Sequence, residues 1–198
     1  NQHGHRFANE SSDYMSFGQR VLELENAGDR VETMWMVFDQ QYRNNYVFAA
    51  ELFPRMAIPQ RWYDAGIAVR ADSHAELADK MGVPSTEFTQ TIVRFNENAS
   101  AGQDPEFGRG RSAYDRYYGD PTVAPNPNLR ALTAGPFYAV KLVLSDLGTC
   151  GGLRADERAR VLREDGSAID GLYAIGNTAA NAFGATYPGA GATIAQGL

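Results

Sequence analysis

The chain has 198 residues, a net charge of −6 and 43% hydrophobic residues, which is ordinary for a globular protein with a real core. The acidic balance and the lack of a basic run argue against nucleic acid as a partner, and no apolar run approaches the ~20 residues that cross a bilayer. A single cysteine excludes an internal disulfide and favours a reducing, cytoplasmic location. The three histidines show no metal-ligand spacing with that cysteine, so we expect no metal site.

The first hundred residues predict helices around one early strand. Residues 14–24 look helical, and residues 33–38, rich in Met, Trp, Val and Phe, suit a buried strand. The apolar segment 46–53 is ambiguous between helix and strand. Ser73 and Glu76 have capping-box spacing, which predicts a helix over about residues 74–81.

A second helix is expected to begin at residues 82–85 and to end near Ala99. Phe88, Ile92 and Phe95 would form its apolar stripe, with Gly102 as the stop.

The remainder of the chain predicts a long irregular segment followed by strands. Residues 102–127 are loop-like, and so long an irregular segment is usually functional or flexible. Residues 137–144 predict a strand. Residues 160–162 and 168–175 predict two more strands that flank an Asp-Gly turn, which is a strong hairpin signal.

The C-terminal thirty residues are the most informative. Residues 171–176 are an apolar run that predicts a buried strand, and a Gly-rich turn at 189–191 then opens a short apolar segment. Such a turn at a helix N-terminus can bind negative charge and let backbone approach a flat ligand. From the residues alone, an ordinary strand–turn–helix connection is equally compatible.

These blocks resemble a known family. Gly-Leu-Tyr-Ala-Ile-Gly-Asn at 171–177 and Tyr-Pro-Gly-Ala-Gly-Ala-Thr-Ile at 187–194 resemble the C-terminal flavin segment of the 3-ketosteroid dehydrogenases, within the fumarate reductase/succinate dehydrogenase flavoprotein group. The resemblance continues through further blocks that together cover essentially the whole chain, at residues 6–10, 35–39, 112–121, 135–140 and 146–153.

The resemblance implies an α+β fold with two parts. Residues 1–147 would be the substrate-binding, catalytic domain, and residues 148–198 would be the C-terminal strand–turn–helix segment of a Rossmann-like FAD-binding domain. A Gly-x-Gly-x-x-Gly turn for the pyrophosphate is not found in the sequence, because Ile194 stands where Gly189-Ala190-Gly191 would need its third glycine. We therefore expect the N-terminal ADP-binding part to lie outside this chain.

The reaction implied by the family is FAD-dependent removal of hydrogen across the C1–C2 bond of a 3-ketosteroid. Tyr187 and the backbone N–H of Gly191 match the two donors to the C3 ketone oxygen. Tyr14 matches the proposed proton acceptor, although Asp13 stands where the family usually has proline. That carboxylate would disfavour a phenolate nearby.

The resemblance also implies a set of cofactor contacts. The matching positions are Gly151, Gly152, Gly176, Asn177, Ala192, Thr193 and Ile194. Gly148 stands where the dicarboxylate reductases keep a histidine, which favours a steroid over a dicarboxylate as the substrate. Cys150 is expected to be a small packed residue. Two alternatives stay open: a sister enzyme, such as a Δ4-dehydrogenase or enone reductase, and a non-catalytic fragment without the ADP site. The electron acceptor is not indicated.

Overall fold

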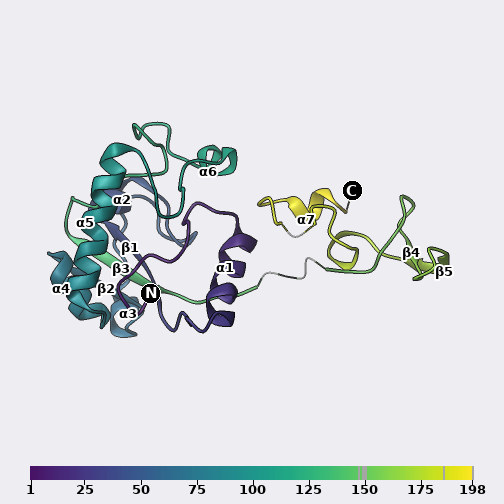
Figure 1. The fold of residues 1–198 in the computed structure, drawn as a ribbon, viewed down its shortest axis with the longest axis horizontal. Coiled ribbons are helices and arrows are strands. Elements are labelled where there is room, and N and C mark those ends of the chain that lie inside the picture. Colours follow the sequence, from purple (N-terminus) through teal and green to yellow (C-terminus); the bar gives the residue numbers. More distant parts are fainter. Residues whose placement is uncertain (147, 149–150, 185, 198) are drawn as a thin grey trace. The chain divides into compact units, whose positions relative to one another are not determined.

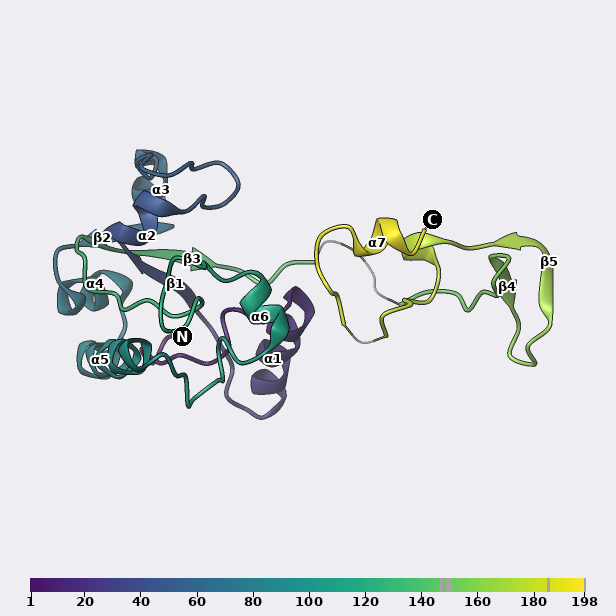
Figure 2. The same ribbon diagram turned by 90° about the horizontal axis from the view of Figure 1, so that it is seen from above.

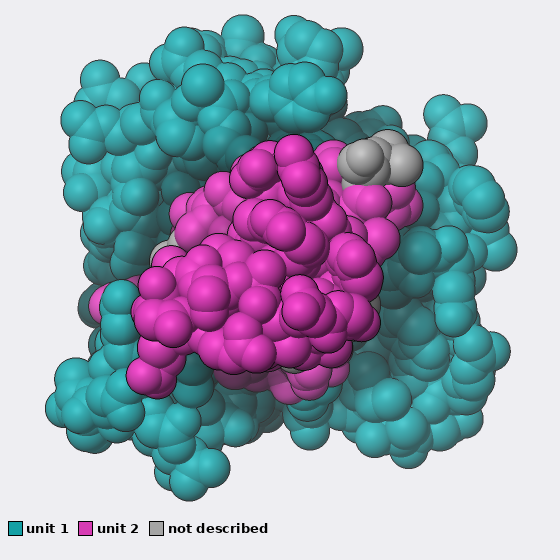
Figure 3. All heavy atoms as spheres, turned by 90° about the vertical axis from the view of Figure 1, so that its right-hand side faces the viewer, with its two compact units in different colours: residues 1–11, 21–143 teal, residues 12–20, 144–198 magenta. Residues whose placement is uncertain are grey.

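The computed structural model describes residues 1–146, 148, 151–184 and 186–197, and only the backbone of Thr193. It is a mixed fold of helices and strands. The chain divides into two compact units, residues 1–11 with 21–143 and residues 12–20 with 144–198 (Figure 3). We call them unit 1 and unit 2. Among the described residues, no helix combines the length and apolar character that crossing a membrane requires.

Unit 1 is built on a three-stranded antiparallel sheet in the order β1-β3-β2 (Figure 1). Its strands are β1 (Met34–Asp39), β2 (Ala68–Ala71) and β3 (Phe137–Leu142). Ala139 lies opposite Val37 on one side and Val69 on the other, so β3 is the central strand. The sequence predicted β1 and β3, the latter two residues too long, and carried no signal for the short β2.

The central strand is buried on both faces. Phe137 and Ala139 belong to one hydrophobic cluster, and Tyr138 and Val140 belong to another. Successive side chains of a strand point to opposite faces, so this alternation gives the sheet a core on each side.

Helices α4 (His74–Met81) and α5 (Ser85–Ala101) pack on one face of the sheet (Figure 2). The predicted cap at α4 is confirmed, because Ser73 Oγ accepts a hydrogen bond from Glu76 N–H at 3.2 Å. Both helices end at a glycine in the left-handed conformation, Gly82 and Gly102, where a residue without Cβ relieves the strain. The predicted stop at Gly102 is thus confirmed, and α5 ends two residues later than expected.

Helices α2 (Gln40–Asn45) and α3 (Gln60–Asp64) belong to the opposite side of the sheet, together with the second cluster. The segment 46–53 forms neither of the predicted elements. The segment folds back on itself, and Phe48 and Leu52 form an isolated antiparallel bridge. Arg43 is buried beneath this turn and donates to the carbonyls of Tyr46 and Phe53, which fixes its irregular path.

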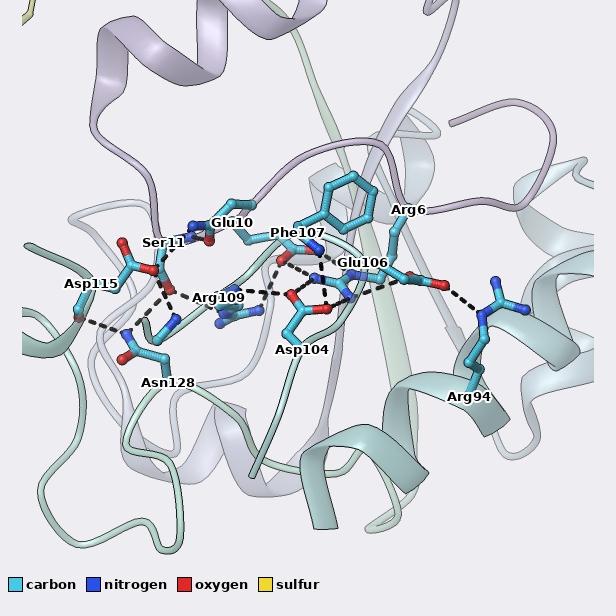
Figure 4. A network of polar contacts seen from close by, with 12 residues as sticks. Arg6, Glu10, Ser11, Arg94, Asp104, Glu106, Phe107, Arg109, Asp115 and Asn128 are labelled. Atoms are coloured by element: carbon cyan, nitrogen blue, oxygen red, sulfur yellow. Dashed lines mark hydrogen bonds and ion pairs between the residues drawn. The ribbon is translucent and has the colours of Figure 1, made fainter. Parts of the chain in front are cut away.

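The loop-like region 102–127 contains one short helix, α6 (Ala113–Tyr117). A polar network ties this region to the N-terminal segment (Figure 4). Arg6 donates to both carboxylate oxygens of Asp104, at 3.0 and 2.8 Å, and to both of Glu10, at 2.9 and 2.8 Å. Arg109 donates to Glu10 at 3.2 Å and to Ser11 at 3.0 Å. The region is therefore anchored by buried charge despite its irregular backbone.

Unit 2 contains the first part of α1 (Tyr14–Asn26), β4 (Arg160–Leu162), β5 (Ala168–Tyr173), the 3-10 turn η1 (Gly176–Thr178) and α7 (Ala192–Ala195). The predicted hairpin is confirmed, because β4 and β5 pair antiparallel. The prediction of a buried strand at 171–176 is wrong. Leu172, Tyr173 and Ile175 are 41%, 63% and 59% exposed, because β5 pairs only with β4 and no further layer of unit 2 covers its faces among the described residues.

Candidate active site

Tyr14 is the first residue of helix α1. The carboxylate of Asp13 accepts hydrogen bonds from the N–H groups of Met15 and Ser16, both at 3.1 Å, and from the Ser16 hydroxyl at 2.5 Å. Aspartate is among the best residues for this capping position. The residue that departs from the family pattern thus has a local role, which is to begin the helix that carries Tyr14.

Tyr187 lies in the loop before α7, and its ring meets that of Tyr14. The ring centroids are 5.8 Å apart with an interplanar angle of 23°. Tyr187 is half-buried and Tyr14 is 61% exposed. Among the described residues, neither hydroxyl has a hydrogen-bond partner. Two residues from opposite ends of the sequence, both singled out as catalytic candidates, are therefore neighbours in unit 2.

Side-chain hydrogen bonds shape the loop that leads to Tyr187. Asn181 Nδ2 donates to the carbonyls of Gly184, at 2.8 Å, and Thr186, at 3.1 Å, while its Oδ1 accepts from Phe183 N–H at 3.1 Å. The Thr186 hydroxyl donates to the Phe183 carbonyl at 3.0 Å. Sequence reasoning missed Asn181, although an asparagine before a Gly-rich stretch is a known turn-forming signal.

Gly191 precedes α7 with φ 92°, a conformation that favours glycine. A Cβ at this position would meet none of the described residues within 4 Å, so on their side space lies open beside its backbone. Among the described residues, no acceptor takes the N–H of Gly191. The predicted helix after it exists but has only four residues, so its dipole is small.

The predicted cofactor positions at the end of the chain are held together by one side chain that sequence reasoning also missed. Gln196 donates to the Gly176 carbonyl at 2.9 Å and accepts from Ala182 N–H at 3.2 Å. It thereby connects the end of α7 to η1. Ala192 is buried in the helix and Ile194 is 69% exposed. The side chain of Thr193 lies outside the described residues.

The glycine pair at 151–152 serves a backbone contact. Leu153 forms a parallel bridge with Ala179, and a Cβ on Gly152 would lie 2.4 Å from the carbonyl carbon and oxygen of Ala179. Gly151 is exposed beside it, and Asn177 is exposed with its amide near Gly148. Cys150 lies outside the described residues. Gly152 is therefore required by packing within the protein, whatever else it contacts.

Within the described part of unit 2, the candidate site consists of two phenols, Tyr14 on α1 and Tyr187 in the loop before α7, and the N–H of Gly191. Phenol hydroxyls and backbone N–H groups both donate hydrogen bonds to an oxygen that gains charge, and a phenol also exchanges protons. Among the described residues, no group of three His, Cys, Asp or Glu side chains could hold a metal ion.

Comparison with known proteins identifies the family. Residues 1–194 match the family model described as FAD binding domain, which confirms the flavin expected from the sequence. The chain is similar over its whole length to the 3-oxosteroid 1-dehydrogenase of Mycolicibacterium smegmatis, with 49% sequence identity, and the match covers 35% of that protein. It is also similar over its whole length to the 4-oxocyclohex-2-ene-1-carboxylate 5-dehydrogenase of Sinomonas cyclohexanicum, with 40% sequence identity, and this match covers 33% of that protein.

A solved structure gives the same result. The crystal structure of 3-ketosteroid delta1-dehydrogenase from Sterolibacterium denitrificans, in complex with 1,4-androstadiene-3,17-dione, superposes with a TM-score of 0.87 at 38% identity. The match covers 100% of this chain and 35% of that one, so the chain spans about a third of the length of its relatives. The chain belongs to the FAD-binding flavoprotein family that includes the 3-ketosteroid Δ1-dehydrogenases.

Proposed function

We propose that this chain forms part of an FAD-dependent 3-ketosteroid Δ1-dehydrogenase and contributes its ketone-binding and proton-accepting groups. The observation that carries the proposal is the contact between the rings of Tyr14 and Tyr187, 5.8 Å apart at their centroids. Membership of the family indicates the class of reaction. The contact brings together the residue expected to accept the C2 proton, Tyr14, and the residue expected to bind the C3 ketone, Tyr187.

Tyr187 and Gly191 would bind the substrate ketone. The phenol of Tyr187 and the N–H of Gly191 donate to the C3 oxygen, where negative charge develops as C2 loses its proton. Because both donors can be in place before the reaction, they stabilise the enolate without reorganising solvent. The open backbone at Gly191 leaves room for the ketone oxygen to reach the N–H.

Tyr14, in its phenolate form, would accept the C2 proton and become a neutral phenol. Because a phenolate is a minor form of tyrosine near neutral pH, the transfer needs a ketone that is already polarised by its two donors, which makes the C2 proton easier to remove. FAD, when bound, supplies the acceptor for the hydride that leaves C1. With the C2 proton taken by the Tyr14 phenolate and a hydride acceptor in place at C1, the electron pair of the C2–H bond would form the C1–C2 double bond.

The residues of this chain fit a flavin. Gly191 combines a left-handed backbone with open space, which allows a flat ring to approach the main chain. We assign Gly176, Asn177, Ala192, Thr193 and Ile194 to the same surface, with Gly151 beside them. Gly152 belongs to the same proposed set, and its backbone lies close to the Ala179 carbonyl.

In this proposal, residues 1–147 are the substrate-binding domain in an α+β arrangement, and residues 148–198 are the last segment of the FAD-binding domain. Residues 12–20, which include Tyr14, belong with residues 144–198 in unit 2 and would accompany the flavin segment. The partner is a small steroid. The cytoplasm is the proposed compartment because the single cysteine suits reducing conditions.

A second candidate is dehydrogenation of a smaller ring ketone. The 40% identical relative from Sinomonas cyclohexanicum is named for a substrate with one oxidised ring and a carboxylate. A carboxylate calls for a cationic or multiple N–H partner, and Tyr14 and Tyr187 offer none. This favours the apolar, ketone-bearing substrate.

The proposal is tested on the protein expressed from its complete gene and loaded with FAD. A 3-ketosteroid and an artificial electron acceptor should give a 1-dehydro product, identified by mass and ultraviolet absorbance. A 4-dehydro product would instead indicate the sister activity, and turnover of 4-oxocyclohexanecarboxylate alone would favour the smaller ketone. Protein that takes up no FAD would overturn the proposal.

A further inference from the structure

We propose that Asn181 is a positioning residue for Tyr187, acting through the loop between them. This inference rests on the proposed function, because it concerns the placement of the hydroxyl that binds the ketone. Within the described part of the chain, the three hydrogen bonds of the Asn181 side chain all go to the backbone of Phe183, Gly184 and Thr186.

The strongest part of the argument is the bond to Thr186. Asn181 Nδ2 donates to the Thr186 carbonyl at 3.1 Å, and that carbonyl belongs to the peptide unit joined to Tyr187. Because a peptide unit is planar, holding its oxygen also fixes the direction of its N–H and of the Tyr187 Cα. The side chain of Asn181 therefore acts on the backbone from which the phenol extends.

The other contacts close the loop. Asn181 Oδ1 accepts from Phe183 N–H at 3.1 Å, and Nδ2 donates a second time, to Gly184 O at 2.8 Å. Thr186 Oγ1 donates to Phe183 O at 3.0 Å. These two side chains add to the backbone hydrogen bond from Gly184 N–H to the Asn181 carbonyl, at 3.2 Å, and together they hold the described part of the turn, as Asn and Thr side chains commonly do in loops.

The loop is also tied to the flavin segment. Gln196 accepts from Ala182 N–H at 3.2 Å and donates to Gly176 O at 2.9 Å. The residue next to Asn181 is therefore fastened to the end of the helix that begins after Gly191. Asn181 extends this connection to Tyr187, so the two ketone donors share one hydrogen-bonded frame.

The chemistry of Asn181 requires an amide. An asparagine both donates and accepts, whereas an aspartate only accepts. Asn181→Asp keeps the bond from Phe183 N–H but removes both donations and places a negative oxygen near the carbonyls of Gly184 and Thr186. It is therefore a nearly isosteric change that should disturb the loop and leave the rest of unit 2 intact.

The experiment uses steady-state kinetics on the FAD-loaded protein expressed from its complete gene, with a 3-ketosteroid and an artificial acceptor. Because misplacing a catalytic group by ~1 Å can cost ~100-fold, we expect Asn181→Asp to lower kcat by about 10- to 100-fold with KM changed by less than about 3-fold. Thr186→Val should lower kcat less, and Thr186→Ser, which keeps the hydroxyl, should restore it. The flavin spectrum should be unchanged in all three.

A double-mutant cycle separates positioning from general stability. Once Tyr187→Phe has removed the hydroxyl, adding Asn181→Asp should lower kcat by no more than about 2-fold. If Asn181→Asp lowers kcat equally in both backgrounds, or not at all in the wild type, the inference is wrong. If Tyr187→Phe itself leaves kcat unchanged, the proposed function fails instead. Should Asn181→Asp not fold, Thr186→Val and Thr186→Ser provide the same cycle.

Discussion

The rings of Tyr14 and Tyr187 stack with their centroids 5.8 Å apart, although one residue begins the first helix and the other precedes the last. Aromatic pairs in this geometry contribute ~0.5–1.5 kcal/mol beyond their buried area. The contact therefore places two hydroxyl-bearing rings side by side. It also allows phenylalanine to replace either residue with the ring packing kept and only the hydroxyl lost.

Tyr187→Phe should lower kcat of the proposed dehydrogenation by about 100- to 1,000-fold, the usual cost of removing one donor to a developing oxyanion. KM should change much less, because the ring and its stacking remain. Rates with a 3-ketosteroid and an artificial acceptor measure this. Tyr173→Phe, a change at an exposed tyrosine in the hairpin, is the matched control and should be silent.

Tyr14→Phe should block proton removal more than ketone binding. With substrate deuterated at C2, the wild type should show a deuterium isotope effect on kcat, and Tyr14→Phe should lower the rate by about 100-fold or more, in the usual range for loss of a general base. A steroid product analogue should bind both proteins with similar affinity. Wild-type rates in Tyr14→Phe would remove this residue from the mechanism.

Gly152→Ala should destabilise the protein even without flavin. The new Cβ would lie 2.4 Å from the Ala179 carbonyl, which is backbone and cannot turn aside. Overpacking of this kind costs ~1–3 kcal/mol or more. Thermal unfolding of the apoprotein measures it. At Gly18, inside α1, a Cβ meets its nearest atom at 3.5 Å, so Gly18→Ala should instead be neutral or stabilising.

Acid should weaken the network around Arg6. Burial alone would raise the pKa of Glu10 and of Asp104, but the hydrogen bonds and positive charge of Arg6, with Arg109 acting on Glu10, hold both values below the ordinary ones. Groups with a lowered pKa stabilise the folded state at neutral pH and lose that contribution as the pH falls below about 4. Urea unfolding at a series of pH values should show this decline.

Asp104→Asn tests the same network directly. The Asp104 side chain is 1% exposed, and its loss leaves Arg6 with Glu10 and Glu106, which are 40% and 30% exposed. Removing one partner of a buried pair costs ~3–5 kcal/mol, so with Glu10 retained we expect about 3 kcal/mol at neutral pH and less in acid. The exposed pair Arg70–Asp72 is the control, because Asp72→Asn should cost under ~1 kcal/mol. Equal costs at the two positions would contradict the assignment.

The sequence predicted helices α1, α4, α5 and α7 because their signals are local, and it missed the short helices α2, α3 and α6. The cap at Ser73 and the stop at Gly102 depend on nearby residues, and both are confirmed. The short strand Ala68–Ala71 was missed because four residues carry little periodicity and its partner lies far along the chain. The exposed strand at 168–173 was misjudged because an apolar run does not reveal which layer covers it.

The residues of the candidate site were also only partly predicted from the sequence. Tyr14, Tyr187 and Gly191 were found through family blocks, and their roles stay predictions. Asn181 and Gln196 were not found, because a turn-forming asparagine or a terminal glutamine in a single sequence does not indicate which backbone groups its amide binds. Only coordinates show which carbonyl an amide reaches.

Unit 2 takes its residues from both ends of the chain, 12–20 and 144–198, while unit 1 takes the residues on either side of the first segment. No single cut can therefore divide one unit from the other. A truncated protein that ends at residue 143, or one that starts at 144, would contain one tyrosine of the stacked pair without its neighbour. Recombination between homologous genes would keep the two stretches of unit 2 matched only if it exchanged both together. We therefore expect the parts of the gene that encode residues 12–20 and 144–198 to be inherited together.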